Sequence, residues 1–256
     1  MDTSNGIPII PDDHPRAKSL HYRHLLVEAM HQKIVTPSGL CAHGRGEAFD
    51  YLIGERTTPI AEKSMEAAMA VLLTAKHPII SVNGNVAALV GKELVEFSQI
   101  FHIPLEINIF YQAEGRLDAI TQLLQSYGAT DLLGVGDFEP KQLSHLSSNR
   151  RIVDPRGIYQ ADVVVVPLED GDRTEALVAA GKYVIAIDLN PLSRTAQKAH
   201  LTIVDNLIRV IPQMITIGKR IQTLSRDLLE QLISNFDQPK NLKHSVEYII
   251  KYLKTQ

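Results

Sequence analysis

The chain has 256 residues, of which 45% are hydrophobic and 21% charged, a profile typical of an ordinary globular protein with one large or two small domains. A formal net charge of −3 excludes proteins that attract nucleic acid or anionic membranes by bulk charge. Cys41 is the only cysteine, which excludes an internal disulfide and a thiolate metal cluster. The apolar runs are far shorter than the roughly 20 residues of a membrane span, so we expect a soluble, cytoplasmic protein.

Residues 1–77 are expected to be mainly helical. Leucine, alanine and methionine side chains recur at helical spacing over residues 19–33 and predict a first helix. A short helix is expected over residues 47–53. Thr58 followed by Pro59 suits the start of a third helix that runs to about Ala75.

The hydrophobic pattern changes at residue 78, where short apolar runs begin to alternate with helical stretches. Helices are expected at 86–100, 115–127 and 173–180, and strands at 78–82, 105–110, 132–135, 163–166, 183–187 and 201–204. Such alternation predicts an α/β fold whose mostly parallel, doubly wound sheet is covered by helices on both faces. Residues 136–162 give a looser pattern.

Residues 207–256 are expected to be helical again, with amphipathic stretches at 208–223 and 246–253. No stretch has the composition of a linker. We therefore expect one domain, made of a helical part (1–77), a sheet core (78–206) and a second helical part (207–256).

The turn after the strand at 78–82 is a candidate anion site. In an open parallel sheet, ligands lie beyond the carboxyl ends of the strands, and the free N–H groups of a helix N-terminus favour anions. Asn83 and Asn85 flank Gly84 there; they tolerate left-handed backbone angles and offer amide hydrogen bonds. An ordinary helix cap with two asparagines explains the pattern about as well.

The sequence HGRGEAFD (43–50) is a more pointed candidate. Glycines on both sides of Arg45 let the backbone approach a ligand while the guanidinium binds phosphate oxygens. His43 is either a proton shuttle or a hydrogen-bonded loop histidine. Arg16 and Arg23 lie upstream and are kept as candidates, because a site that handles several phosphates needs several cations.

The acidic sequence EDGDRTE (169–175) follows the strand at 163–166. Asp172 and Glu175 have the spacing of a capping box, with Asp172 as N-cap. Asp170 is then the better candidate for a metal or a substrate amine, since Mg²⁺ takes one or two carboxylates and keeps most of its waters.

Polar side chains also follow the last two strands. Asp188 is placed for a ribose hydroxyl and Arg194 for phosphate, while Asn206 suits a turn cap or a contact to adenine. Two common nucleotide signatures are absent: no G-x-G-x-x-G follows a strand, and no Walker A loop exists. Four strand ends with polar loops nevertheless predict one site for a phosphorylated ligand.

Several of these segments together resemble the 4-phosphopantoate–β-alanine ligase family, also called archaeal phosphopantothenate synthetase. The similar stretches occur in family order and span nearly the whole chain: HPRAKSLHYR (14–23), AHGRGEAFDYLIGERT (42–57), SVNGNVAALV (81–90), LEINIFY (105–111), ADVVVVPLEDGDRTEAL (161–177), IDLNPLSRTAQ (187–197) and TIVDN (202–206). Residues 130–157 and the C-terminal tail match poorly. Thr195 stands where we expect serine in some members, and both residues carry a hydroxyl.

The resemblance implies a Rossmann-like sheet, a homodimer, and ATP, Mg²⁺, 4-phosphopantoate and β-alanine as ligands. It implies an acyl-adenylate route in coenzyme A biosynthesis, with AMP and pyrophosphate as products. Matching the family's motifs places ATP at Arg23, Arg45, Asp188, Leu189, Asn190, Arg194, Thr195, Asn206 and Leu207. Phosphopantoate is placed at Arg16, Asn83 and Asn85, and Arg45 and His43 are the candidate catalytic residues. The metal ligands stay open.

Two other functions are compatible with the sequence. The doubly wound pattern and the SVNGNVAA turn suggest an NAD- or FAD-linked oxidoreductase, although the glycine fingerprint is missing. A nucleotide-sensing regulatory protein without catalysis is the third possibility.

Overall fold

A computed structural model of the chain describes residues 3–4, 7–8, 10–11, 13–14, 16–110, 113–143 and 149–256. Its central element is a six-stranded sheet in the order β10-β9-β8-β3-β4-β5, and all neighbouring strands are parallel. The strands are β3 (Pro78–Val82), β4 (Leu105–Ile107), β5 (Leu132–Leu133), β8 (Val163–Pro167), β9 (Tyr183–Ile187) and β10 (Leu201–Ile203). The chain builds outward from β3 to β5, then returns beside β3 with β8 and builds the other way. This confirms the doubly wound α/β sheet.

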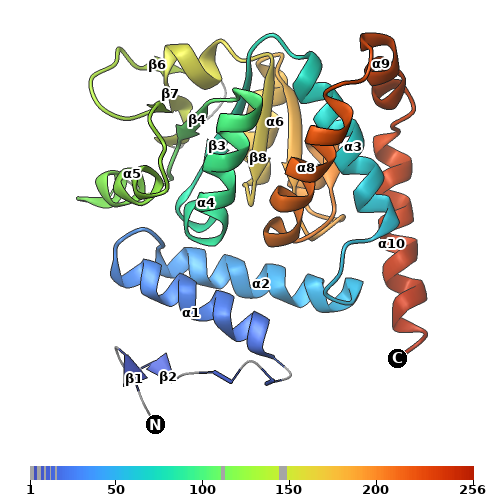
Figure 1. Cartoon of the computed structure of the whole chain (residues 1–256), viewed down its shortest axis with the longest axis horizontal. Helices are drawn as coiled ribbons and strands as arrows, with labels where there is room; N and C mark the ends of the chain where they lie inside the picture. The colour runs from blue at the N-terminus through green and yellow to red at the C-terminus, as the bar shows by residue number, and fades with distance from the viewer. Residues whose placement is uncertain are drawn as a thin grey trace.

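Helices cover the sheet on both faces and extend beyond it. They are α1 (Ala17–His31), α2 (Pro37–Ile53), α3 (Pro59–Thr74), α4 (Gly84–Phe101), α5 (Arg116–Ser126), α6 (Gly171–Ala179), α7 (Arg194–Lys198), α8 (Leu207–Ile221), α9 (Arg226–Ser234) and α10 (Gln238–Leu253). Figure 1 shows α1 and α2 running side by side beneath the sheet, with α10 along one side. None of the described helices combines the length and apolar character that crossing a bilayer requires.

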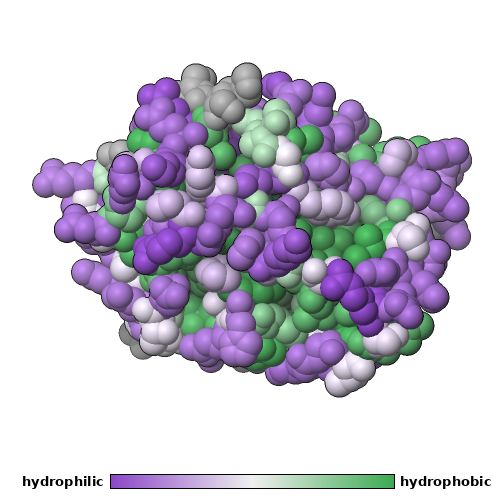
Figure 2. Space-filling model, turned by 90° about the horizontal axis from the view of Figure 1, so that it is seen from above, coloured by the Kyte–Doolittle hydropathy of each residue, from purple (hydrophilic) through white to green (hydrophobic). Residues whose placement is uncertain are grey.

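The two faces of the sheet belong to two hydrophobic cores. Val163 and Val165 pack into the larger core, together with α3, α4 and α8, while Val164 and Val166 pack into the smaller one with Leu177 of α6. Side chains alternate between the faces of a strand, so a run of four valines supplies both cores. Figure 2, which views the end of the molecule opposite to α1 and α2, shows a largely hydrophilic surface with smaller hydrophobic areas.

Residues 47–53 are helical as expected, but they are only the last part of α2, a single helix of 17 residues. It begins ten residues earlier than expected, where Pro37 occupies the first turn and Thr36 accepts a hydrogen bond from the Gly39 N–H at 3.1 Å. The HGRG segment therefore lies inside a helix and not in a loop. Each interior glycine costs about 1 kcal/mol relative to alanine, and packing of α2 against α1 and α4 offsets this cost.

Most other boundaries follow the expectations within a few residues, but β4 and β5 are shorter than the strands expected at 105–110 and 132–135. The looser stretch contains a small antiparallel pair, β6 (Lys141–Gln142) and β7 (Ile152–Val153), a 3₁₀ turn (Asn149–Arg151) and a π turn (Pro155–Tyr159). The strands β1 (Thr3–Ser4) and β2 (Ile7–Pro8) form a second antiparallel pair. Pro15 and Tyr111, which belong to two of the family-like stretches, lie outside the described residues.

Candidate active site

A cavity of about 810 Å³ lies at the carboxyl ends of β3, β8 and β9. The order of the sheet reverses between β3 and β8, and this switch point leaves a crevice in which ligands of open α/β sheets bind. Helix α2 closes the cavity on the side away from the sheet. Arg45, Asn83, Asp188 and Arg194 all line it, so polar segments from distant parts of the sequence gather as expected.

Most of the site residues proposed from sequence contribute to the lining. They are His43, Arg45, Asn83, Asn85, Asp170, Asp188, Leu189, Asn190, Arg194, Thr195 and Asn206. Three others do not. Arg16 is exposed just before α1, Arg23 on α1 forms an ion pair of 3.8 Å with Glu47, and Leu207 is 1% exposed in the hydrophobic core.

One end of the cavity is formed by the loop after β9, which we call the nucleotide end (residues 188–195, with Asn206) because the sequence resemblance predicts ATP there. Asp188 accepts hydrogen bonds from the Ser193 hydroxyl at 2.5 Å and from the Asn190 N–H at 2.9 Å. Burial raises the pKa of Asp188, although these hydrogen bonds and Arg45 oppose the shift. Thr195 donates from its hydroxyl to the Glu169 carbonyl at 2.8 Å and so ties this loop to the one after β8.

Asn83 and Asn85 have structural partners. Asn83 caps α4 by accepting from the Val86 N–H at 3.1 Å, and its amide donates to the Leu168 carbonyl at 3.1 Å. Asn85 donates to the Gly39 carbonyl at 2.9 Å and thereby joins α4 to α2. Neither asparagine uses the left-handed backbone that it tolerates: Asn83 has an extended φ of −112° and Asn85 is helical.

The capping box expected at Asp172 and Glu175 is wrong. Helix α6 begins at Gly171, and Asp170 occupies the N-cap position without a side-chain cap. Glu175 instead forms ion pairs with Arg194 and, at 2.9 Å, with Lys198. Its two cations hold the pKa of Glu175 below its usual range.

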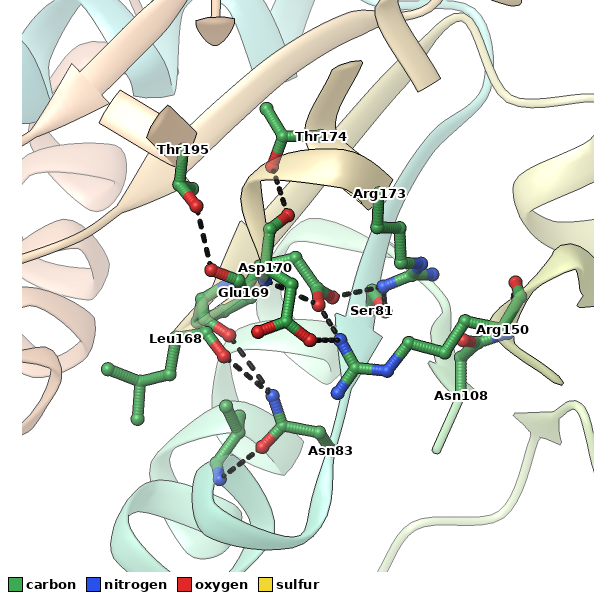
Figure 3. A network of polar contacts seen from close by, with 12 residues as sticks. Ser81, Asn83, Asn108, Arg150, Leu168, Glu169, Asp170, Arg173, Thr174 and Thr195 are labelled. Atoms are coloured by element: carbon green, nitrogen blue, oxygen red, sulfur yellow. Dashed lines mark hydrogen bonds and ion pairs between the residues drawn. The ribbon is translucent and has the colours of Figure 1, made fainter. Parts of the chain in front are cut away.

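A buried ionic cluster lies beneath the loop after β8 (Figure 3), and sequence reasoning missed its two arginines. Glu169 forms ion pairs with both Arg150 and Arg173, and all three side chains are at most 8% exposed. Arg173 also donates to the Ser81 hydroxyl at 3.0 Å. Burial lowers the pKa of each arginine to about 10, and their mutual repulsion adds to the shift for Arg150.

Arg116 was also missed and is 6% exposed. Its Nε donates to the Ile34 carbonyl at 3.1 Å, and its side chain passes over the start of α4. A Cβ added to Gly84 would lie 2.1 Å from the Ile34 carbonyl oxygen, which accepts the Arg116 hydrogen bond, and 2.7 Å from the Arg116 Nη2. Only a glycine admits this close approach, so the NGN turn does have the steric purpose that its glycine suggests.

Helix α2 brings His43 and Arg45 to the wall of the cavity that lies opposite the ends of the strands. Among the described residues, none forms an ion pair or side-chain hydrogen bond with Arg45, which is exposed. Burial lowers the pKa of His43, and nearby Glu47 opposes this shift. The helix is fixed by Asp50, whose carboxylate accepts from Arg209 at 2.5 Å and from the Asn206 amide at 2.6 Å.

The chain is similar to proteins of one enzyme family over nearly its whole length. A family model described as phosphopantothenate/pantothenate synthetase matches residues 60–252. A protein of Thermococcus onnurineus named 4-phosphopantoate–β-alanine ligase is 51% identical over 94% of this chain and 92% of its own. Proteins with the same name from Thermococcus kodakarensis and Methanosarcina mazei are 48% and 45% identical, over 94% and 96% of this chain and 92% and 96% of theirs.

Proposed function

The chain belongs to the phosphopantothenate/pantothenate synthetase family, and from that premise we propose that it is the ATP-dependent ligase that joins 4-phosphopantoate to β-alanine in coenzyme A biosynthesis. The observation that carries this proposal is the extent of the similarity: identities of 42–51% cover at least 94% of the chain. Family membership does not support the NAD- or FAD-linked oxidoreductase.

The reaction proceeds in two balanced steps. A carboxylate oxygen of 4-phosphopantoate attacks the α-phosphorus of ATP and pyrophosphate leaves, which gives an acyl-adenylate. The β-alanine amine then attacks the acyl carbon, AMP leaves, and the amine loses a proton as the amide forms. The carboxylate and the triphosphate repel each other, so the first step needs fixed cations and dipoles above all.

The cavity offers such groups for ATP at its nucleotide end. Asp188 is held in place for the ribose hydroxyls and Arg194 for a phosphate, while Arg45 reaches the same space from α2 and has no ion pair with a described residue. The neighbouring positions proposed for ATP are Leu189, Asn190, Thr195 and Asn206, all of which line the cavity. His43 is the candidate to accept the amine proton, because its lowered pKa keeps the imidazole neutral near pH 7.

A homodimer is part of the proposal. Arg16 and Arg23 do not line the cavity of their own subunit. In a homodimer they would contact ATP and phosphopantoate in the cavity of the second subunit. We also propose that the enzyme works in the cytoplasm, where a single unpaired cysteine is stable.

Mg²⁺ is proposed as the companion of ATP. Among the described residues, no three His, Cys, Asp or Glu side chains gather as a metal site. Asp170 and Asp172 both line the cavity, and this donor set fits Mg²⁺, which binds through one or two carboxylates plus substrate phosphates. When bound, the ion neutralises triphosphate charge.

Mass spectrometry of the products from ATP, 4-phosphopantoate and β-alanine tests the function. Formation of 4′-phosphopantothenate with AMP is the expected result. ADP in place of AMP would contradict the adenylate route, and absence of the amide product would contradict the function. Pyrophosphate release that requires 4-phosphopantoate would exclude a nucleotide sensor without catalysis.

A further inference from the structure

The end of the cavity away from the nucleotide end carries two arginines with no role in the ATP site. Arg116 comes from α5 and Arg150 from the 3₁₀ turn before β7, and both line the cavity beside the first turn of α4. We call Arg116, Arg150 and the first turn of α4 the acid end. Its three parts come from separate regions of the chain, and Arg150 lies in the segment without a recognisable motif.

The acid end is built to bring positive charge close to backbone N–H groups. Gly84 begins α4, and a Cβ there would meet the Ile34 carbonyl oxygen at 2.1 Å and the Arg116 Nη2 at 2.7 Å, so the guanidinium lies close to the first turn of α4. The hydrogen bond from Arg116 Nε to the Ile34 carbonyl fixes this position. A helix N-terminus with an immobilised guanidinium in contact with it favours a phosphate group more strongly than either feature alone.

Arg150 adds a second guanidinium, and this one has an unused donor. The residue is 7% exposed, and its Nε is buried without a hydrogen-bond partner among the described residues. The closest ion-pair contacts are both made by Nη1, while no hydrogen bond joins Nη2 to a described residue. Figure 3 shows the guanidinium reaching between Asp170 and the turn at Asn83, toward the start of α4.

The two carboxylates beside Arg150 differ in how firmly they hold it. Glu169 is 2% exposed and shared with Arg173, so it is a fixed part of the cluster. The Asp170 side chain is 58% exposed and lies 3.6 Å from Nη1, a distance typical of a weak pair. An incoming dianion therefore replaces Asp170 more readily than Glu169.

We propose that Arg116, Arg150 and the first turn of α4 form a phosphate subsite that recognises the phosphate of the phosphorylated acid, and that Asp170 leaves Arg150 when this phosphate binds. The inference rests on the proposed function and names the residues that select the phosphorylated acid over its unphosphorylated analogue. With the phosphate held at the acid end, the carboxylate extends toward the nucleotide end. Without the phosphate, the buried guanidinium of Arg150 keeps an unsatisfied donor, which opposes binding of the analogue.

The test compares both acids on the wild type and on Arg150→Met. We expect Arg150→Met to lower kcat/KM for 4-phosphopantoate by about 100-fold, the effect of losing a charge-assisted, bidentate contact. The value of kcat/KM for pantoate and the KM for ATP should change by less than about 3-fold, because neither depends on the phosphate contact. An equal loss for both acids, or a rise confined to the KM for ATP, would overturn the proposal.

Two further variants guard against a folding defect, because Arg150→Met leaves Glu169 with one partner. Arg150→Lys keeps the positive charge but loses the planar guanidinium that binds a phosphate through two hydrogen bonds. It should therefore show the same selective fall in kcat/KM for 4-phosphopantoate in a stably folded protein. Arg151→Met is the matched control, since Arg151 is the exposed neighbour, and it should behave like the wild type. If Arg150→Lys kept the full selectivity for 4-phosphopantoate over pantoate, this result would also contradict the proposed subsite.

Calorimetry separates failure of this inference from failure of the proposed function. Equal affinities of the wild type and Arg150→Met for 4-phosphopantoate would contradict the subsite but not the ligase function. Wild type that binds 4-phosphopantoate through Arg150 but forms no 4′-phosphopantothenate would contradict the function alone.

Discussion

The Gly39 carbonyl accepts a hydrogen bond of 2.9 Å from the Asn85 amide, and a Cβ on Gly39 would lie only 2.3 Å from the Asn85 Oδ1. This contact sets the distance between α2, which carries His43 and Arg45, and the start of α4. We therefore expect Gly39→Ala to destabilise the protein by about 1–3 kcal/mol, the usual cost of overpacking. Ligase activity should also fall, because α2 is pushed away from the cavity.

Gly44→Ala is the matched control, since Gly44 lies in the same helix and a Cβ there meets no atom within 4 Å. Alanine in place of an interior helical glycine should raise the free energy of unfolding by about 0.5–1 kcal/mol. Urea unfolding and the rate of pyrophosphate release measure both variants. If Gly39→Ala were as stable and active as Gly44→Ala, the contact between Gly39 and Asn85 would not set the position of α2 at the cavity.

Arg45→Ala should lower kcat for pyrophosphate release by about 100-fold or more, because a preorganised cation that faces charge developed in the transition state contributes on this scale. Stability should change little, as Arg45 is exposed and has no ion pair with a described residue. Arg226→Ala removes an exposed arginine that pairs with Glu230 on α9 at 2.8 Å and is the control. Near-normal turnover by Arg45→Ala would contradict the role given to Arg45.

His43 should titrate below the ordinary histidine pKa of 6.5, since burial lowers its pKa. If the neutral imidazole accepts the β-alanine proton, kcat/KM for β-alanine falls only as the pH drops below that lowered pKa. NMR titration of the imidazole gives the pKa directly, and the pH–rate profile should share its midpoint. His43→Gln should lose this acid limb; a variant that keeps the same limb would assign it to another group.

The fold was largely predictable because its signals are local. Alternating apolar strands and helices predicted the sheet, and Thr58 with Pro59 marked the start of α3 correctly. Helix α2 was misjudged because Gly44 and Gly46 have poor helix propensity, whereas its stability depends on distant partners such as Arg209, which binds Asp50. Tertiary contacts of this kind leave no trace in a local pattern.

The cavity was predicted in outline for a related reason. Loops after parallel strands meet at one edge, so Asn83, Asp188 and Arg194 were placed there from sequence alone. Arg116 and Arg150 were missed because neither lies directly after a strand of the main sheet or belongs to a motif. Their burial and their distance to the start of α4 exist only in three dimensions.

Glu106 is a fully buried carboxylate outside the cavity. It accepts hydrogen bonds from the Asp154 N–H at 3.1 Å and the Ile158 N–H at 2.6 Å, and thereby holds the π turn against β4. Burial raises the pKa of Glu106 from 4.5 to about 7, although these two hydrogen bonds and Arg173 oppose the shift. The group therefore titrates near neutral pH in the folded protein.

A raised folded-state pKa means that the folded protein holds the proton where the unfolded chain has already lost it. The stabilisation by Glu106 is full below pH 4.5 and is lost as the pH rises to about 7. This loss in the free energy of unfolding amounts to about 3 kcal/mol at 1.36 kcal/mol per pKa unit.

Glu106→Gln cannot ionise, so its free energy of unfolding should not show this decline with pH, whatever the cost of the altered hydrogen bonds. Urea unfolding of both proteins from pH 4.5 to 8 measures the difference, in which the titrations of His43 and His200 cancel. Parallel pH profiles for the two proteins would show that Glu106 does not titrate in this range.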